Sequence, residues 1–90
     1  GPPGRWLRRL PGPVDLVFCD PPYARVARVE PVLAALARGG KLRTGATVVV
    51  EHARRAPPTL PAAFGAPATY RYGDTAVRIA TAPEPPEPEP

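Results

Sequence analysis

The feature that most constrains this chain is the stretch Val14-Asp-Leu-Val-Phe-Cys-Asp-Pro-Pro-Tyr23. Leu16–Cys19 is an unbroken apolar run, which is typical of a strand buried on both faces of a parallel sheet. Asp20 interrupts the run, and the two prolines after it lack the amide hydrogens that a sheet ladder needs. We therefore predict that the strand ends before Asp20 and presents a carboxylate, a free carbonyl and an aromatic ring at its carboxyl end. Open α/β sheets bind their ligands at that end.

These groups suit the binding of a planar amine. An ionised Asp20 carboxylate accepts two or more hydrogen bonds, and the Pro21 carbonyl accepts another. The ring of Tyr23 can stack on a base, a contact worth about 1–3 kcal/mol, while Pro22 stiffens the loop. Together they could hold the exocyclic NH2 of a base that is splayed or flipped out of a helix. Asp and Pro are also common turn residues, so a buried strand followed by a plain proline turn is the alternative.

The residues after this stretch predict a parallel βαβ unit. A helix is expected to begin near Glu30 and to end at Gly39-Gly40. Its buried stripe consists of Val29, Val32, Leu33 and Leu36. Lys41–Gly45 is predicted to be a turn, and the β-branched run Ala46–Glu51 a second strand. A right-handed crossover then makes the two strands parallel neighbours, with Glu51 at the same sheet edge as Asp20.

A hairpin is predicted to complete the sheet. Ala68–Tyr72 and Thr75–Ala80 flank Gly73-Asp74, a strong signal for a two-residue turn. That turn places Tyr70 opposite Val77 and Ala68 opposite Ile79, so we expect the tyrosines of the first hairpin strand to face the core. The proline-rich segment 53–67 is predicted to be a loop with one helical turn near residues 62–64. His52 is interpreted as a solvent-facing strand end, because no Cys or acid cluster lies at metal-ligand spacing around it.

Charge is distributed unevenly along the chain. All twelve Lys and Arg residues and five of the eight acids precede residue 83, so residues 1–82 carry a charge of +7 against +4 for the whole chain. Such a basic segment suits a polyanionic partner, and Arg25 and Arg28 beside Tyr23 could reach RNA phosphates. An arginine-rich surface that reflects coding bias is the alternative. A single cysteine and the lack of a long apolar run predict a reducing, cytoplasmic location and no membrane contact.

Asp20-Pro-Pro-Tyr23 resembles the (Asp/Asn)-Pro-Pro-(Tyr/Phe/Trp) motif of S-adenosylmethionine-dependent amino-methyltransferases that act on nucleic-acid bases. With Val14–Tyr23, the helix, the strand ending in Glu51 and Tyr72–Ala76, the chain is similar to the RsmD family of bacterial 16S ribosomal RNA (guanine-N2)-methyltransferases. The resemblance implies an α/β fold, the C-terminal half of a Rossmann-like methyltransferase, over residues 1–82. The family's acidic-Gly-x-Gly cofactor loop, in the other half, has no counterpart in this sequence. Residues 83–90 are expected to be a disordered Pro/Glu tail.

The resemblance also implies a function. S-adenosylmethionine would be the cofactor, and the substrate an exocyclic amine, guanine N2 of 16S ribosomal RNA in the small subunit. Asp20 and Pro21 would be catalytic, and the substrate-binding residues would be Pro22, Tyr23, Arg25 and Arg28. We expect no metal, a monomer, and no activity from the 90 residues alone. Two alternatives are an adenine-N6 or cytosine-N4 DNA methyltransferase, which shares the motif, and a catalytically silent, basic RNA-binding remnant.

Overall fold

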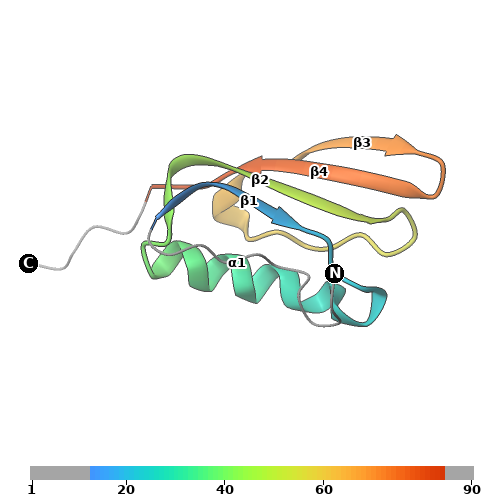
Figure 1. The fold of residues 1–90 in the computed structure, drawn as a ribbon, viewed down its shortest axis with the longest axis horizontal. Coiled ribbons are helices and arrows are strands. Elements are labelled where there is room, and N and C mark those ends of the chain that lie inside the picture. The colour runs from blue at the N-terminus through green and yellow to red at the C-terminus, as the bar shows by residue number, and fades with distance from the viewer. Residues whose placement is uncertain (1–12, 85–90) are drawn as a thin grey trace, which may run out of the picture.

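The computed structural model describes residues 13–84, which form a four-stranded sheet with a helix and a long loop packed on one face (Figure 1). The elements in chain order are β1 (Val14–Cys19), the 3-10 helix η1 (Tyr23–Arg28), α1 (Val29–Arg38), β2 (Leu42–Ala53), the 3-10 helix η2 (Ala62–Phe64), β3 (Ala68–Tyr72) and β4 (Thr75–Thr81). The strand order is β1-β2-β4-β3. β1 is parallel to β2, and β4 is antiparallel to both of its neighbours. The predicted parallel βαβ unit and antiparallel hairpin are therefore confirmed.

The second strand is longer than the sequence predicted. Most of Lys41–Gly45 belongs to β2, which begins at Leu42 and runs for 12 residues. The prediction of a turn was wrong because these residues belong to a strand with an irregular register. Val14 pairs with Leu42, but Leu16, two residues later, pairs with Thr47, so β2 contains extra residues between the two pairs. Gly45, at φ +79°, absorbs the irregularity in a backbone region that side chains disfavour.

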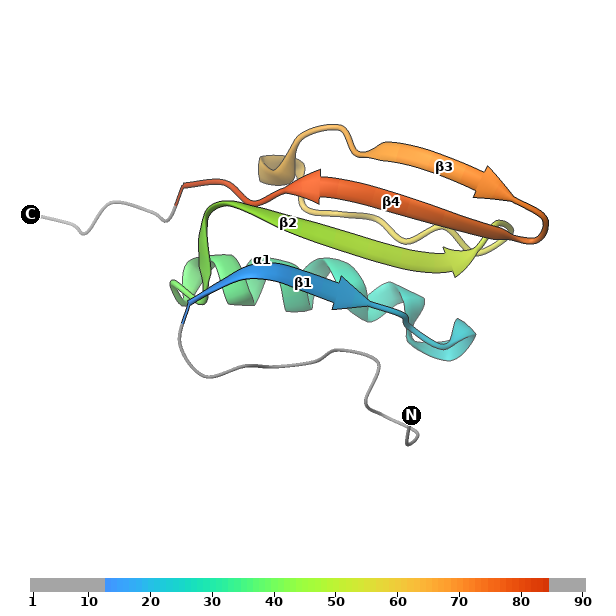
Figure 2. The same ribbon diagram turned by 45° about the horizontal axis from the view of Figure 1, so that its top comes forward.

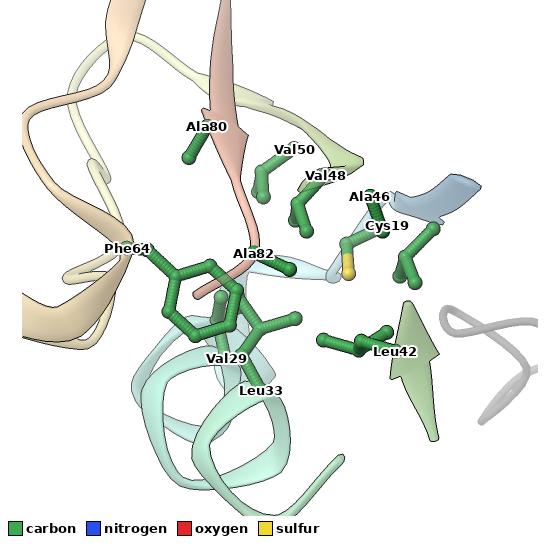
Figure 3. Packing of buried hydrophobic residues seen from close by; sticks show 11 residues of the cluster. Cys19, Val29, Leu33, Leu42, Ala46, Val48, Val50, Phe64, Ala80 and Ala82 are labelled. Atoms are coloured by element: carbon green, nitrogen blue, oxygen red, sulfur yellow. The ribbon is translucent and has the colours of Figure 1, made fainter. Parts of the chain in front are cut away.

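The core lies between the sheet and α1. Val17 and Cys19 from β1 and Val48 and Val50 from β2 point to this face, because side chains alternate along a strand. They meet Val29 and Leu33 of α1, both fully buried as predicted, while Val32 and Leu36 of the predicted stripe are only partly buried. Phe64 of η2 closes the core beside α1 (Figure 3). The helical turn predicted near residues 62–64 is confirmed and supplies this ring.

The other face of the sheet is open. Leu16 and Phe18 are 59% and 47% exposed, and Tyr70, Tyr72 and Ile79 are exposed as well. In Figure 2, α1 and the loop lie behind the sheet, and no described helix covers its near side. The predictions of a strand buried on both faces and of core-facing tyrosines are therefore wrong for residues 13–84. Tyr70, Val77 and Ile79 do share one face, as predicted, but it is the face opposite to the one that α1 covers.

The hairpin has the predicted register. Tyr70 pairs with Val77 and Ala68 with Ile79. Gly73 takes the left-handed φ of +60° that a tight two-residue turn requires at this position. The predicted Pro/Glu tail lies outside the described residues from position 85 onward.

Candidate functional site

The Asp20–Tyr23 segment leaves the sheet at the carboxyl end of β1. Cys19 pairs with Val50, so Asp20 follows β1 at the level of Glu51 in the neighbouring parallel strand. Asp20 is exposed, Pro21 is buried, and the Tyr23 side chain is 65% exposed. The structure thus places a carboxylate and an aromatic ring at the predicted edge of the sheet. The buried Pro21 between them anchors the loop.

The two prolines have different roles in the loop. Pro22 is extended, with φ −62° and ψ 156°, and its carbonyl accepts a hydrogen bond of 2.7 Å from the Arg25 amide. This bond closes the first turn of η1. Within residues 13–84, no backbone amide donates to the Pro21 carbonyl. The turn therefore uses the Pro22 carbonyl, and the Pro21 carbonyl, which is the acceptor predicted from the sequence, takes no part in it.

The carboxylate of Asp20 also has no partner within residues 13–84. The one ion pair among the described residues joins Arg43 Nε to Asp15 Oδ1 at 3.5 Å, with both side chains more than half exposed. That pair involves the start of β1, not its carboxyl end. Asp20 can consequently offer its acceptors to a ligand without first giving up an ion pair to an arginine of the described range.

Cys19, directly before Asp20, is a core residue. It is fully buried and unpaired. Burial raises the pKa of its thiol from 9.0 to about 11, because the low-dielectric core disfavours the thiolate. The thiol therefore stays protonated at neutral pH and packs as a small apolar side chain.

Arginines gather around the motif loop. Arg25 and Arg28 lie exposed in the last turn of η1, next to Tyr23 as predicted from sequence. Sequence reasoning missed Arg55, whose guanidinium carbon lies 5.7 Å from the centroid of the Tyr23 ring. The available signal was the pair Arg54-Arg55 directly after β2, at the carboxyl edge that β1 and β2 share.

A shallow hollow of about 480 Å³ opens beside the Tyr23 ring. Its walls come from η1, the start of α1 and residues 56–59, and include Tyr23, Val26, Ala27, Glu30, Pro57 and Thr59. The lining combines apolar side chains with one carboxylate, that of Glu30, and the two hydroxyls of Tyr23 and Thr59. Small-molecule sites commonly have this size and this balance of polar and apolar groups.

His52 is not the solvent-facing strand end that the sequence suggested. It is 5% exposed and lies on the α1 side of the sheet, in register with the buried Ala76. Its Nδ1 is 2.8 Å from the Ala53 carbonyl, and its Nε2 is buried without a partner among the described residues. The prediction failed because β2 continues to Ala53 and the following loop folds back over this face.

Residues 13–84 do not by themselves make a recognisable S-adenosylmethionine site. Glycines with left-handed φ occur at Gly40 and Gly45, beside the amino end of β2, at Gly65 near η2, and at Gly73 in the hairpin. None of these glycines belongs to an acidic-Gly-x-Gly segment, the cofactor loop that the resemblance assigns to the other half of the fold. Nor does this part of the chain bring three His, Cys, Asp or Glu side chains close enough to hold a metal ion. Its helices are too short and polar to cross a membrane.

The parallel strand pair, its crossover helix and the antiparallel hairpin define a class, the α/β proteins with a Rossmann-like fold. Comparison with known proteins makes this specific. The model of the family described as "Conserved hypothetical protein 95" matches residues 5–81, and the chain belongs to this RsmD-like family. The resemblance drawn from the motif is therefore confirmed.

A solved structure has the same fold. It is the "putative methylase HI0767" from Haemophilus influenzae, which is similar over 86% of this chain with a TM-score of 0.63 and 22% sequence identity. The chain spans 48% of the length of that protein. No curated protein sequence matches the chain significantly.

Proposed function

We propose that this chain forms the amine-binding part of an S-adenosylmethionine-dependent methyltransferase acting on guanine N2 of 16S ribosomal RNA in the small ribosomal subunit. Membership of the RsmD-like family supports methyl transfer. The observation that carries the proposal is a pair of acceptors, the Asp20 carboxylate and the Pro21 carbonyl, that have no partner within residues 13–84 and lie beside an exposed ring at the carboxyl end of β1.

In this proposal, the chain's own residues prepare the amine. Asp20 and the Pro21 carbonyl accept hydrogen bonds from the NH2 group, which orients its lone pair away from the ring. They also stabilise the positive charge that develops on nitrogen as its bond to the methyl group forms and the bond of the methyl group to its donor breaks. The Asp20 carboxylate can then accept the proton that nitrogen loses. Tyr23 holds the base by stacking, and the extended Pro22 fixes the ring relative to the carboxylate. S-adenosylmethionine would supply the methyl group.

The experiment compares two single-stranded oligonucleotides that differ only in one base, guanosine or inosine. Inosine lacks the 2-amino group but keeps the rest of the guanine edge, so an amine site binds the guanosine form more tightly. We expect the preference to be about tenfold, since inosine loses one charge-assisted hydrogen bond to the Asp20 carboxylate and one neutral hydrogen bond to the Pro21 carbonyl. NMR titration of the isotope-labelled chain measures both affinities and reports whether the Asp20 and Tyr23 amides shift.

The matched variants are Asp20→Ala and Asp15→Ala. Asp15 is a carboxylate on the same strand, but at its other end and in an exposed ion pair. We expect Asp20→Ala to abolish the guanosine preference and Asp15→Ala to keep it. Equal binding of guanosine and inosine by the wild-type chain would contradict guanine N2 as the target. A preference for adenosine over purine riboside would instead favour the adenine-N6 alternative.

A further inference from the structure

Arg55 and Tyr23 come from distant parts of the sequence and meet at the motif loop. Tyr23 begins η1, and Arg55 lies two residues beyond the end of β2, with its guanidinium over the Tyr23 ring at 5.7 Å. The neighbouring Arg54 is used differently. Its Nη1 donates to the Gly73 carbonyl at 3.2 Å, and its amide donates to the Asp74 carbonyl at 2.8 Å. Arg54 therefore fastens the hairpin, while Arg55 faces the site.

A guanidinium that lies over a ring keeps its hydrogen-bond donors available. The planar group can lie against the aromatic face while its N–H bonds point outward from its rim. Among the described residues, no carboxylate pairs with Arg55. Its charge and its donors are therefore open to an anion, and a phosphate is the anion whose geometry fits this fork of donors best.

The hollow beside the ring gives such a ligand room. Val26, Ala27 and Pro57 provide apolar wall, and Glu30 and Thr59 provide the polar atoms. Arg25 and Arg28 are exposed on the same η1. The hollow and Arg55 meet at the Tyr23 ring, which lines the hollow and lies beneath the guanidinium. A hollow beside a stacked cation, with exposed arginines on the η1 that forms one of its walls, complements a nucleotide: a flat base and a negatively charged backbone.

We infer that Arg55, Tyr23 and this hollow form a second nucleotide subsite, which binds the residue adjacent to the target base in a single strand. Arg55 binds the phosphate that joins the two nucleotides, and the hollow receives the neighbouring base. Tyr23 lies between the two positions, so that Arg55 also fixes the ring on which the target base stacks. The inference rests on the proposed function in taking a nucleic acid as substrate.

The test measures binding of a fluorescein-labelled single-stranded RNA of about ten nucleotides, within the site size of such grooves, by anisotropy over a range of salt concentrations. Arg55→Ala is expected to weaken binding about tenfold, the effect of losing a charge-assisted contact. It should also reduce the slope of log K against log salt by about 0.7, the value for one phosphate of a single strand. Arg55→Lys should keep the slope but restore only part of the affinity, because an ammonium lacks the planar fork.

Two controls separate this subsite from general positive charge. Arg54→Ala removes the same charge one residue away and should weaken binding less than threefold. In a double-mutant cycle, Arg55→Ala should have a smaller effect in a Tyr23→Ala background, while Arg54→Ala should have the same effect in both backgrounds. An RNA with abasic residues on either side of the guanosine should bind the wild-type chain several-fold more weakly, yet respond to Arg55→Ala with the same change in salt slope.

Equal losses from Arg54→Ala and Arg55→Ala, or strict additivity of Arg55 with Tyr23, would overturn the subsite. Such a result leaves the preference for guanosine over inosine intact, so failure of the subsite is distinguishable from failure of the proposed function. Undetectable binding of the RNA by the wild-type chain would likewise overturn the subsite.

Discussion

Nη1 of Arg78, on β4, donates a hydrogen bond of 3.1 Å to the carbonyl of Pro58. Arg78 pairs with the buried Val50 and therefore points to the face that α1 covers. Pro58 is fully buried and belongs to the same segment between β2 and η2 that carries Arg55. A side chain on the last strand thus fastens the segment that places Arg55 over Tyr23.

Replacement of Arg78 should loosen this segment more than it destabilises the sheet. Arg78→Met keeps the apolar stem but removes the bond to Pro58, which as a charge-assisted contact contributes about 1.5–3 kcal/mol. The change also removes Nε of Arg78, which is buried without a partner among the described residues. Losing this unsatisfied group offsets part of the stability lost with the bond to Pro58. We expect faster hydrogen exchange at the Ala56 amide, with a loss of global stability below about 2 kcal/mol.

Arg71→Met is the matched control for this change. Arg71 lies on β3, is exposed, and makes no side-chain hydrogen bond within the described residues. It should leave exchange at the Ala56 amide unchanged. Equal protection of that amide in the wild type and in Arg78→Met would show that packing of Pro58 alone holds the segment.

The buried thiol makes stability depend on pH at the alkaline end. Burial raises the pKa of Cys19 from 9.0 to about 11, so between these values the folded chain binds a proton that the unfolded chain has lost. This contribution is complete below pH 9 and is lost as pH rises through 11, and it amounts to roughly 3 kcal/mol by linkage. We expect the stability of the wild type to fall over this range relative to Cys19→Ala, measured by urea unfolding at each pH. Parallel curves for the two proteins would contradict it.

The open sheet face predicts concentration-dependent self-association of the 90-residue chain, which differs from the monomer expected from its sequence. Leu16 and Ile79 are 59% and 36% exposed, whereas Leu33 of α1 is fully buried. The double change Leu16→Thr and Ile79→Thr should cost less than about 2 kcal/mol, since threonine suits strands and little packing is lost. Leu33→Ala should cost about 2–5 kcal/mol through the cavity it leaves. Sedimentation should show weaker concentration-dependent association for the double variant, because its apolar patch is smaller. Unchanged association of the double variant would show that the chain associates through a surface other than this sheet face.

The elements of this fold could be read from the sequence where local signals decide them. The proline pair after Cys19, the double glycine after Arg38 and Gly73-Asp74 each act within a few residues, and the strand, helix and hairpin that they bound lie close to the predicted limits. The register of β3 against β4 followed from the turn alone.

The features that the sequence did not predict depend on how distant segments pack together. The burial of His52 follows from the return of the loop over β2, and the exposure of Tyr70 from the lack of a described layer on the other face. Likewise, the contact between Arg55 and Tyr23 joins residues that no periodicity relates. For the site, the sequence therefore predicted the groups that follow β1, but not the residue that reaches them from β2.

In the proposed mechanism, turnover depends most strongly on the Asp20 carboxylate. In the catalytically competent protein, Asp20→Ala should lower turnover by roughly 10²–10³, the usual cost of one preorganised contact to developing charge. Stability should be nearly unchanged, because Asp20 is exposed and its carboxylate has no partner among the described residues. Tyr23→Phe keeps the ring and should retain most activity, whereas Tyr23→Ala should lose about 1–3 kcal/mol of stacking.

The measurement is single-turnover methylation of bare 16S ribosomal RNA and of assembled small subunits, with melting curves recorded for every variant. Asp15→Ala serves as the control, since it removes an exposed carboxylate from the other end of β1. If the segment were only a proline turn, Asp20→Ala would change stability and turnover together, through misfolding. The proposed mechanism instead requires that turnover falls while the melting temperature stays within a few degrees. Full activity of Asp20→Ala at normal stability would end the assignment of this carboxylate to the amine.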